Sequence, residues 1–142
     1  MTFMVMPDLE AVVSKTLRDA GYSAYSSIPN DPTWPLLIVS RAGGIPPIRQ
    51  YLDGARIQVD VWGGAKGDPP PAVTKSQIQD IAQTARTIIF ALEGTTVISP
   101  VEAFISGVDD ASGLLWLPDD ATGRDRYLFA VMVYGRSLLP TE

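Results

Sequence analysis

The chain carries few of the side chains that usually perform catalysis. Among its 142 residues there is no cysteine and no histidine. Thiolate nucleophiles, disulfides, zinc sites of the Cys/His type and histidine-based triads are therefore excluded. Carboxylates, hydroxyls and lysines remain, but their spacing does not pair a nucleophile with a base. We expect a protein that is not an enzyme, with no catalytic residue and no cofactor.

Two pairs of adjacent acids are the candidates for a metal site. Asp109 with Asp110, and Asp119 with Asp120, could supply the oxygen ligands that Mg²⁺ or Ca²⁺ prefers. Neither pair has the spacing of an EF-hand loop, and adjacent acids in turns are usually solvated. The Asp-Gly-Ala segment at 53–55 lacks the hydroxyl residue of an aspartic protease. We expect no metal site, and a small metal- or carboxylate-dependent enzyme is the alternative from another functional class.

The segment 63–71, GGAKGDPPP, has the position of a phosphate-binding loop, because a helix is expected after it. A P-loop requires Gly-Lys-Ser/Thr, whereas here Lys66 precedes Gly67. The three prolines remove backbone donors that would hold a phosphate, and Asp68 repels an anion. We interpret the segment as a stiff structural or subunit-contacting loop.

Charge is distributed unevenly along the chain. The net charge of −5 disfavours a general nucleic-acid binder. The segment 94–123 has no lysine or arginine, and its five acids are Glu102, Asp109, Asp110, Asp119 and Asp120. Arg41, Arg49 and Arg56 lie in a stretch whose only acid is Asp53. Solvated loops of opposite sign are one interpretation. The other is a head-to-tail contact, in which the acidic patch of one copy meets the basic patch of the next.

Two amphipathic helices are expected, at 7–20 and 74–93. Pro7 suits the first position of the first helix. Thr74 or Ser76 can cap the second helix, with a glutamine three residues further on. Each helix has one apolar stripe, so both should cover a sheet.

Period-2 alternation and apolar runs predict the strands of that sheet. The expected strands are 22–28, 36–41, 55–62, 97–108, 114–117 and 127–134. Loops or turns are expected at 45–50, 109–113 and 119–125, where prolines, glycines or acids gather. The run 127–134 is apolar on both faces, which is typical of a central strand or of a strand covered by another subunit.

This order predicts one α+β domain spanning 1–142: a mixed or antiparallel sheet with two amphipathic helices packed on one face. The longest strongly apolar run without a charge falls far short of the ~20 residues that cross a membrane, so no membrane partner is expected. Trp34, Trp62 and Trp116 lie beside loops or strand ends. They are either core anchors or interface anchors, and Trp62 on the polar side of its strand needs some partner to cover it.

Two stretches resemble the tail terminator proteins of long-tailed actinobacterial phages. They are ARIQVDVWGGAKGDPPPAVTKSQIQDIAQTARTIIFAL and GLLWLPDDATGRDRYLFAVMVYGR, which together cover roughly 55–136. The resemblance lies in a pattern of strand, loop and helix and not in a catalytic signature.

The resemblance implies an α+β subunit that forms a ring, hexameric in family members, on the end of the finished tail tube. Such a ring stops tube polymerisation and offers a surface for head–tail joining. The implied partners are further copies of the chain, the tail tube protein and the head–tail connector, with DNA passing through the ring without specific binding. The implied location is the head-proximal end of the phage tail, after assembly in the host cytoplasm. The family has no catalytic residues to carry over.

The interface residues are chosen from this sequence alone. We predict that Arg41, Arg49 and Arg56 face the acidic segment 102–120 of a neighbouring copy, with Trp62 and Trp116 near the joint. The other members of this candidate interface are Lys66, Asp119 and Asp120. Reversing the charge at Arg56 should weaken assembly, and a reversal at either aspartate should restore part of it. Another neck, connector or tail-completion protein with a similar subunit fold is the competing assignment.

Overall fold

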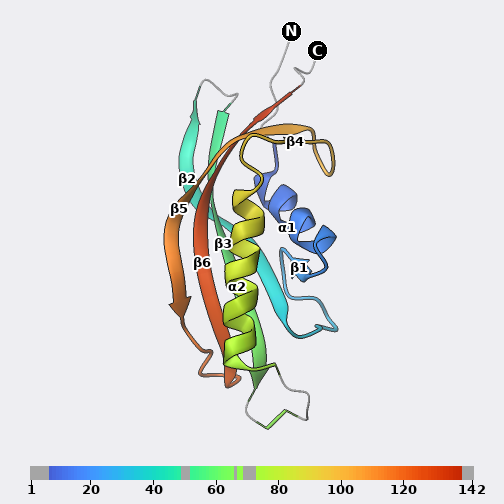
Figure 1. The fold of residues 1–142 in the computed structure, drawn as a ribbon, viewed down its shortest axis with the longest axis vertical. Helices are drawn as coiled ribbons and strands as arrows, with labels where there is room; N and C mark the ends of the chain where they lie inside the picture. Colours follow the sequence, from blue (N-terminus) through green and yellow to red (C-terminus); the bar gives the residue numbers. More distant parts are fainter. Residues whose placement is uncertain (1–6, 49–51, 66, 69–72, 139–142) are drawn as a thin grey trace.

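The computed structural model describes residues 7–48, 52–65, 67–68 and 73–138 (Figure 1). Two helices lie on one face of a six-stranded sheet, and the long strands curve across the molecule (Figure 1). The elements in chain order are α1 (Leu9–Asp19), β1 (Ser23–Tyr25), β2 (Leu36–Ile48), β3 (Leu52–Ala65), α2 (Lys75–Phe90), β4 (Thr96–Val97), β5 (Ala103–Trp116) and β6 (Arg124–Ser137). The predicted α+β fold with both helices on one face is confirmed.

The strand order across the sheet is β1-β2-β3-β6-β5-β4. β1 pairs with β2 in parallel, and every other neighbouring pair is antiparallel, so the sheet is mixed. β6 lies between β3 and β5. The run 127–134 therefore belongs to a central strand, the first of the two alternatives that its apolar pattern allowed.

Alternation along the strands places the core between sheet and helices. Ala55, Ile57, Val59 and Val61 of β3 are fully buried, as the period-2 pattern requires. The remaining core side chains come from the same face of the other strands and from the apolar stripes of α1 and α2; among the largest are Phe129, Leu9, Leu17, Leu37, Ile78, Ile89 and Ile105. Burying one such side chain contributes about 1.5–3 kcal/mol, so this layer is the main source of stability.

Local capping sets both helix starts. Asp8 is the N-cap of α1 and accepts a hydrogen bond from Ala11 N at 3.0 Å, so Pro7 precedes the cap and is not the first helical residue. Thr74 caps α2 in a capping box with Gln77, which confirms one of the two predicted caps. α2 ends at Phe90, three residues earlier than expected, because the chain turns there to pair with β5.

Three predictions about strands were wrong. The expected strand 97–108 is divided, because β4 ends at Val97 and β5 begins only at Ala103. β2 continues to Ile48, although a loop was expected at 45–50. This part of β2 has no neighbouring strand on its outer side within the described residues, and prolines are tolerated on such an edge because no ladder bond is lost there. β5 runs unbroken from Ala103 to Trp116, although a turn was expected at 109–113. Pairing with β6 carries β5 through this acidic stretch, with three register shifts that absorb the extra residues.

Candidate subunit interface

The two faces of the sheet differ in what covers them. The face packed against α1 and α2, here called the helix face, holds the core. On the opposite face, here called the bare face, no helix packs within the described part of the chain (Figure 1). The bare face is formed by alternate residues of the strands, which on β3 and β6 are Arg56, Gln58, Asp60, Trp62, Arg126, Leu128, Ala130, Met132 and Tyr134.

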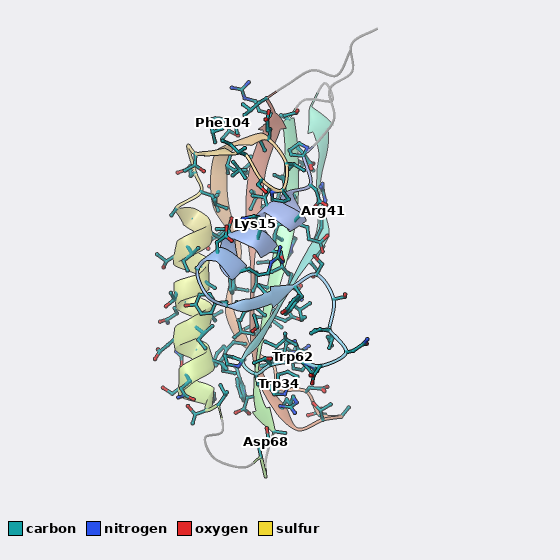
Figure 2. All side chains as sticks on the ribbon, turned by 90° about the vertical axis from the view of Figure 1, so that its right-hand side faces the viewer. Lys15, Trp34, Arg41, Trp62, Asp68 and Phe104 are labelled. Carbon is teal, nitrogen blue, oxygen red and sulfur yellow. The ribbon has the colours of Figure 1, made fainter. Side chains whose placement is uncertain are left out.

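Arg41 lies at the outer edge of the sheet and is already paired within the chain (labelled in Figure 2). Its guanidinium donates to both carboxylate oxygens of Asp53, at 2.5 and 2.9 Å, and its Nε donates to Gly43 O at 3.3 Å. Asp53 is 2% exposed. The hydrogen bond to this carboxylate raises the pKa of Arg41. The charge of Arg41 is therefore largely compensated before any neighbour arrives.

Arg56 and Trp62 are both on β3 and lie on the bare face, six residues apart. The ring of Trp62 is covered by the guanidinium of Arg126, 4.7 Å from the ring centroid, and Arg126 also lies 3.8 Å from Asp60. Trp62, on the polar side of β3, is therefore covered by a residue of β6 in the same chain. Arg56 Nε and Trp62 Nε1 are buried and have no hydrogen-bond partner. Such groups are uncommon in folded proteins and mark the bare face as unusual.

Trp116 lies on the helix face and therefore not with Trp62. The Trp116 ring packs against Tyr127, with 5.1 Å between the two ring centroids. Lys75 Nζ lies 4.1 Å from the centroid of the Trp116 ring. These contacts agree with the reading of Trp116 as a core anchor. One subunit does not present the two tryptophans at a single joint.

Asp119 and Asp120 occupy the turn between β5 and β6. The carboxylate of Asp119 accepts hydrogen bonds from Thr122 N at 3.2 Å and from Thr122 Oγ1 at 2.6 Å, which lower the pKa of Asp119. Asp120 is exposed. Arg49 and Lys66 lie outside the described residues. The proposed rescue of an Arg56 reversal by Asp119 or Asp120 stays a prediction.

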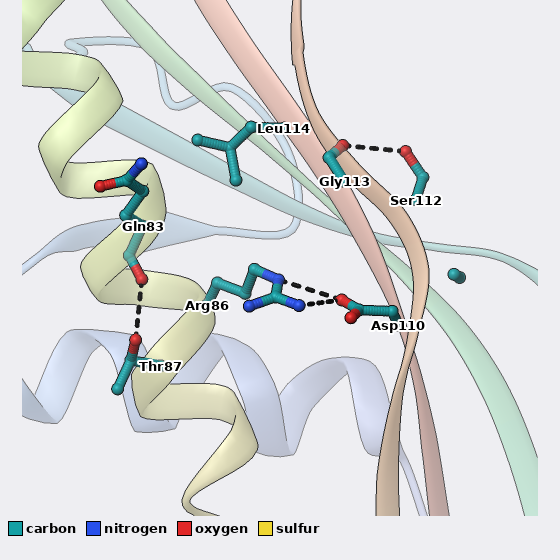
Figure 3. Close-up of a pocket in the computed structure, with 8 residues that line it drawn as sticks. Gln83, Arg86, Thr87, Asp110, Ser112, Gly113 and Leu114 are labelled. Carbon is teal, nitrogen blue, oxygen red and sulfur yellow. Dashed lines mark hydrogen bonds and ion pairs between the residues drawn. The ribbon is translucent and has the colours of Figure 1, made fainter.

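One part of each charged segment nevertheless lies on an edge of the sheet, and the two edges are opposite. Asp109 and Asp110 are exposed on β5, and Arg41 is on β2. Arg86 of α2 pairs with Asp110 across a groove of about 550 Å³ (Figure 3). The sequence could not reveal these internal pairs of Arg41 and Asp110, because their partners are 12 and 24 residues away along the chain.

A second hollow, of about 250 Å³, lies at one end of the bare face. Its lining includes Trp34, Leu36, Trp62 and Arg124, and the guanidinium of Arg124 stacks 3.7 Å from the centroid of Trp34 (Trp34 and Trp62 in Figure 2). Arg124 also reaches Asp68, at 3.4 Å. Both arginine contacts are internal, and the hollow is mostly apolar.

Neither hollow gathers a set of acids. Over the described ranges, no group of three or more Asp or Glu side chains is arranged to hold a metal ion. No helix in the same part of the chain is long and apolar enough to cross a membrane. No protein-family model matches the chain, and no significant match is found among curated proteins.

Proposed function

We propose that this protein is a phage tail terminator, a structural subunit that forms a ring on the end of the tail tube. The ring stops polymerisation of the tube and offers the surface for head–tail joining. Support comes from the resemblance of roughly 55–136 to that family and from the α+β subunit with two helices on one sheet face.

The observation that carries the proposal is the position of Arg41 relative to Asp109 and Asp110. A ring of identical subunits needs two different, complementary surfaces on each copy. Asp109 and Asp110 lie on one edge of the sheet, and Arg41 lies on the other. An enzyme would need convergent groups around one pocket, whereas the charged side chains discussed above, within the described ranges, are spread over edges and turns.

The test is electron microscopy of tails assembled with and without this protein. A terminator is expected to give tails of uniform length, and its deletion should give tube-like tails of uncontrolled length. Adding the purified protein to growing tubes should cap their ends. Tails of normal, uniform length in its absence would overturn the proposal.

A second binding experiment separates the terminator from its competitor. Purified protein is mixed with tail tubes or with portal and connector rings from the same phage. A terminator binds the tube ends in the absence of any head component. Binding to connector rings alone would assign the chain to another neck or tail-completion role.

A further inference from the structure

Both edges of the sheet have a long stretch that no strand of the same chain covers. β1 pairs only with residues 36–38 of β2. β4 pairs only with 103–104 of β5, and the backbone of Gly94 and Thr95 adds bonds to Ile105. Over the described residues, 39–48 of β2 (the β2 edge) and 107–116 of β5 (the β5 edge) therefore have a neighbouring strand on one side only. Exposed edges of this length are templates for pairing with another chain.

The directions of the two edges suit one another. β2, β3, β6 and β5 are successively antiparallel, so β5 runs opposite to β2. If the β5 edge of one copy lies beside the β2 edge of the next, the new pair is antiparallel and continues the alternation. Two β2 edges or two β5 edges would instead join through a twofold axis, which makes a closed dimer and not a ring.

The register places opposite charges at the same level of the sheet. Arg41 is in line with Ile57 on β3, Ile57 with Val131 on β6, and Val131 with Asp110 on β5. Residues directly opposite in an antiparallel pair share a face. In a sheet continued without offset, Arg41 of one copy would therefore lie opposite Asp110 of the next, on the helix face of both.

The groups at this level still have bonding capacity. A guanidinium has five N–H donors, and Arg41 uses three of them in the bonds described above. Contact with a neighbour's Asp110 would extend two internal pairs into an alternating chain, Asp53–Arg41–Asp110–Arg86. Asp109 pairs with Met132 and therefore lies on the bare face, outside this chain of charges.

Like charges disfavour the alternative in which two identical edges pair. Pairing of two β5 edges would set Asp109 and Asp110 near their own copies, which is destabilising. One amide of the β5 edge, Val108 N, is already bound to Glu93 Oε1 at 3.2 Å, so strand addition would use the rest of this edge.

We infer that copies of this chain join by strand addition, with the β5 edge of one antiparallel to the β2 edge of the next and Arg41 close to Asp110 across the joint. The closure of this head-to-tail contact into a ring rests on the proposed function. The contact itself is a property of the two edges.

The absence of cysteine makes the joint directly testable by cross-linking, since an introduced thiol is unique. Ala42 and Ala111 are exposed, one on each edge. Single variants Ala42→Cys and Ala111→Cys are mixed and treated with a short bis-maleimide. We expect the 42–111 heterodimer and little 42–42 or 111–111 product. The double variant should give a ladder that ends in one closed species without free thiols.

Two controls sharpen this result. Ala121→Cys places a thiol in the exposed β5–β6 turn, away from both edges, and should not link to Ala42→Cys. Asp110→Asn, added to the Ala111→Cys variant, should lower the initial rate of 42–111 linking about tenfold at low ionic strength. Asp80→Asn removes an exposed acid of α2 and should leave that rate unchanged.

The experiment is run both on free protein and on protein bound to tail tubes. Absence of the 42–111 link in both samples, or links that are mainly 42–42 and 111–111, would overturn the inference. If the protein caps tubes without this link, the inference fails and the terminator proposal stands. If the link forms but tubes are not capped, the terminator proposal fails and the interface stands.

Discussion

At the scale of single residues, the arginines of this protein mostly satisfy acids and rings of their own chain. Arg41 pairs with the buried carboxylate of Asp53, Arg86 with Asp110, and Arg126 with Asp60 and the Trp62 ring. A charge that is conspicuous in the sequence is therefore not free in the fold. An interface residue must offer remaining donors or acceptors, and Arg41 does.

The pair of Arg41 and Asp53 should be a large term in the stability of the subunit. Arg41→Ala is expected to lower the free energy of unfolding by about 2–3 kcal/mol, because it leaves a buried carboxylate without its donor. Chemical denaturation at neutral pH measures this. Lys15→Ala is the control: it breaks an exposed pair with Asp19 and should cost only about 0.3–0.5 kcal/mol. Equal losses of unfolding free energy in the two variants would contradict this role of the Arg41–Asp53 pair.

The pKa of Asp119 should depend on Thr122. Thr122→Val removes the hydroxyl that holds the pKa of Asp119 below the ordinary value of 3.8, so this pKa should rise. An NMR titration of the carboxyl carbon measures it, and Thr122→Ser should preserve the low value.

The sign for stability follows by linkage. Because the folded-state pKa of Asp119 is depressed, its contribution is present above pH 3.8 and is lost as the pH falls through the folded-state value. The valine variant should be less stable than the parent at neutral pH, and the difference should shrink in acid. A difference that does not change with pH would contradict this account.

At the scale of elements, bulges let β2 and β5 pass through sequence that would otherwise break a strand. β2 shifts register between Arg41 and Gly44 and again between Ile45 and Ile48. Gly43 and Gly44 both have positive φ, at 91° and 133°, which L side chains rarely adopt. The first bulge therefore depends on glycine, and it lies within the proposed joint.

Gly44→Ala should be far more damaging than Gly43→Ala. A Cβ at Gly44 would lie 2.0 Å from Gly54 O, a backbone atom of the neighbouring strand, whereas a Cβ at Gly43 meets nothing within 4 Å. We expect a loss of about 1–2 kcal/mol at Gly43 from backbone strain alone, and about 3 kcal/mol or more at Gly44. Thermal unfolding of the two variants measures the difference, and similar losses would show that the bulge relaxes easily.

At the scale of the whole molecule, the sheet has one face covered by helices, one bare face and two edges, one with Arg41 and the other with Asp109 and Asp110. Burial of apolar side chains on the helix face stabilises the folded subunit. The edges offer the two different surfaces that a ring requires, while the bare face carries the unpartnered Arg56 Nε and Trp62 Nε1. Under the proposed function, these are the surfaces available for contact with neighbouring copies and with the tube.

If opposite charges steer the joint, self-association should weaken as salt is raised. Light scattering across a salt series should show a falling molar mass at constant protein concentration, because exposed charges are screened. Asp110→Asn should already have the lower mass at low salt and should change little as salt increases. A molar mass of the parent protein that rises with salt would indicate that apolar contacts dominate assembly instead.

The sequence by itself determined the local features of this protein. Caps at Asp8 and Thr74, the apolar stripes of the helices and the alternation along β3 arise from residues within a few positions of one another. Such short-range patterns predicted the order of elements and the α+β class. They also excluded thiol and imidazole chemistry, since composition needs no structure.

Only the tertiary structure decided which strands are long, which charges are neutralised and which face each tryptophan occupies. Pairing with β6 overrode the turn signals of 109–113, and an edge position let β2 continue through its prolines. Asp53 compensates Arg41, and Trp62 and Trp116 lie on opposite faces. These outcomes depend on contacts between residues far apart along the chain, and such contacts form only when the strands pair into the sheet.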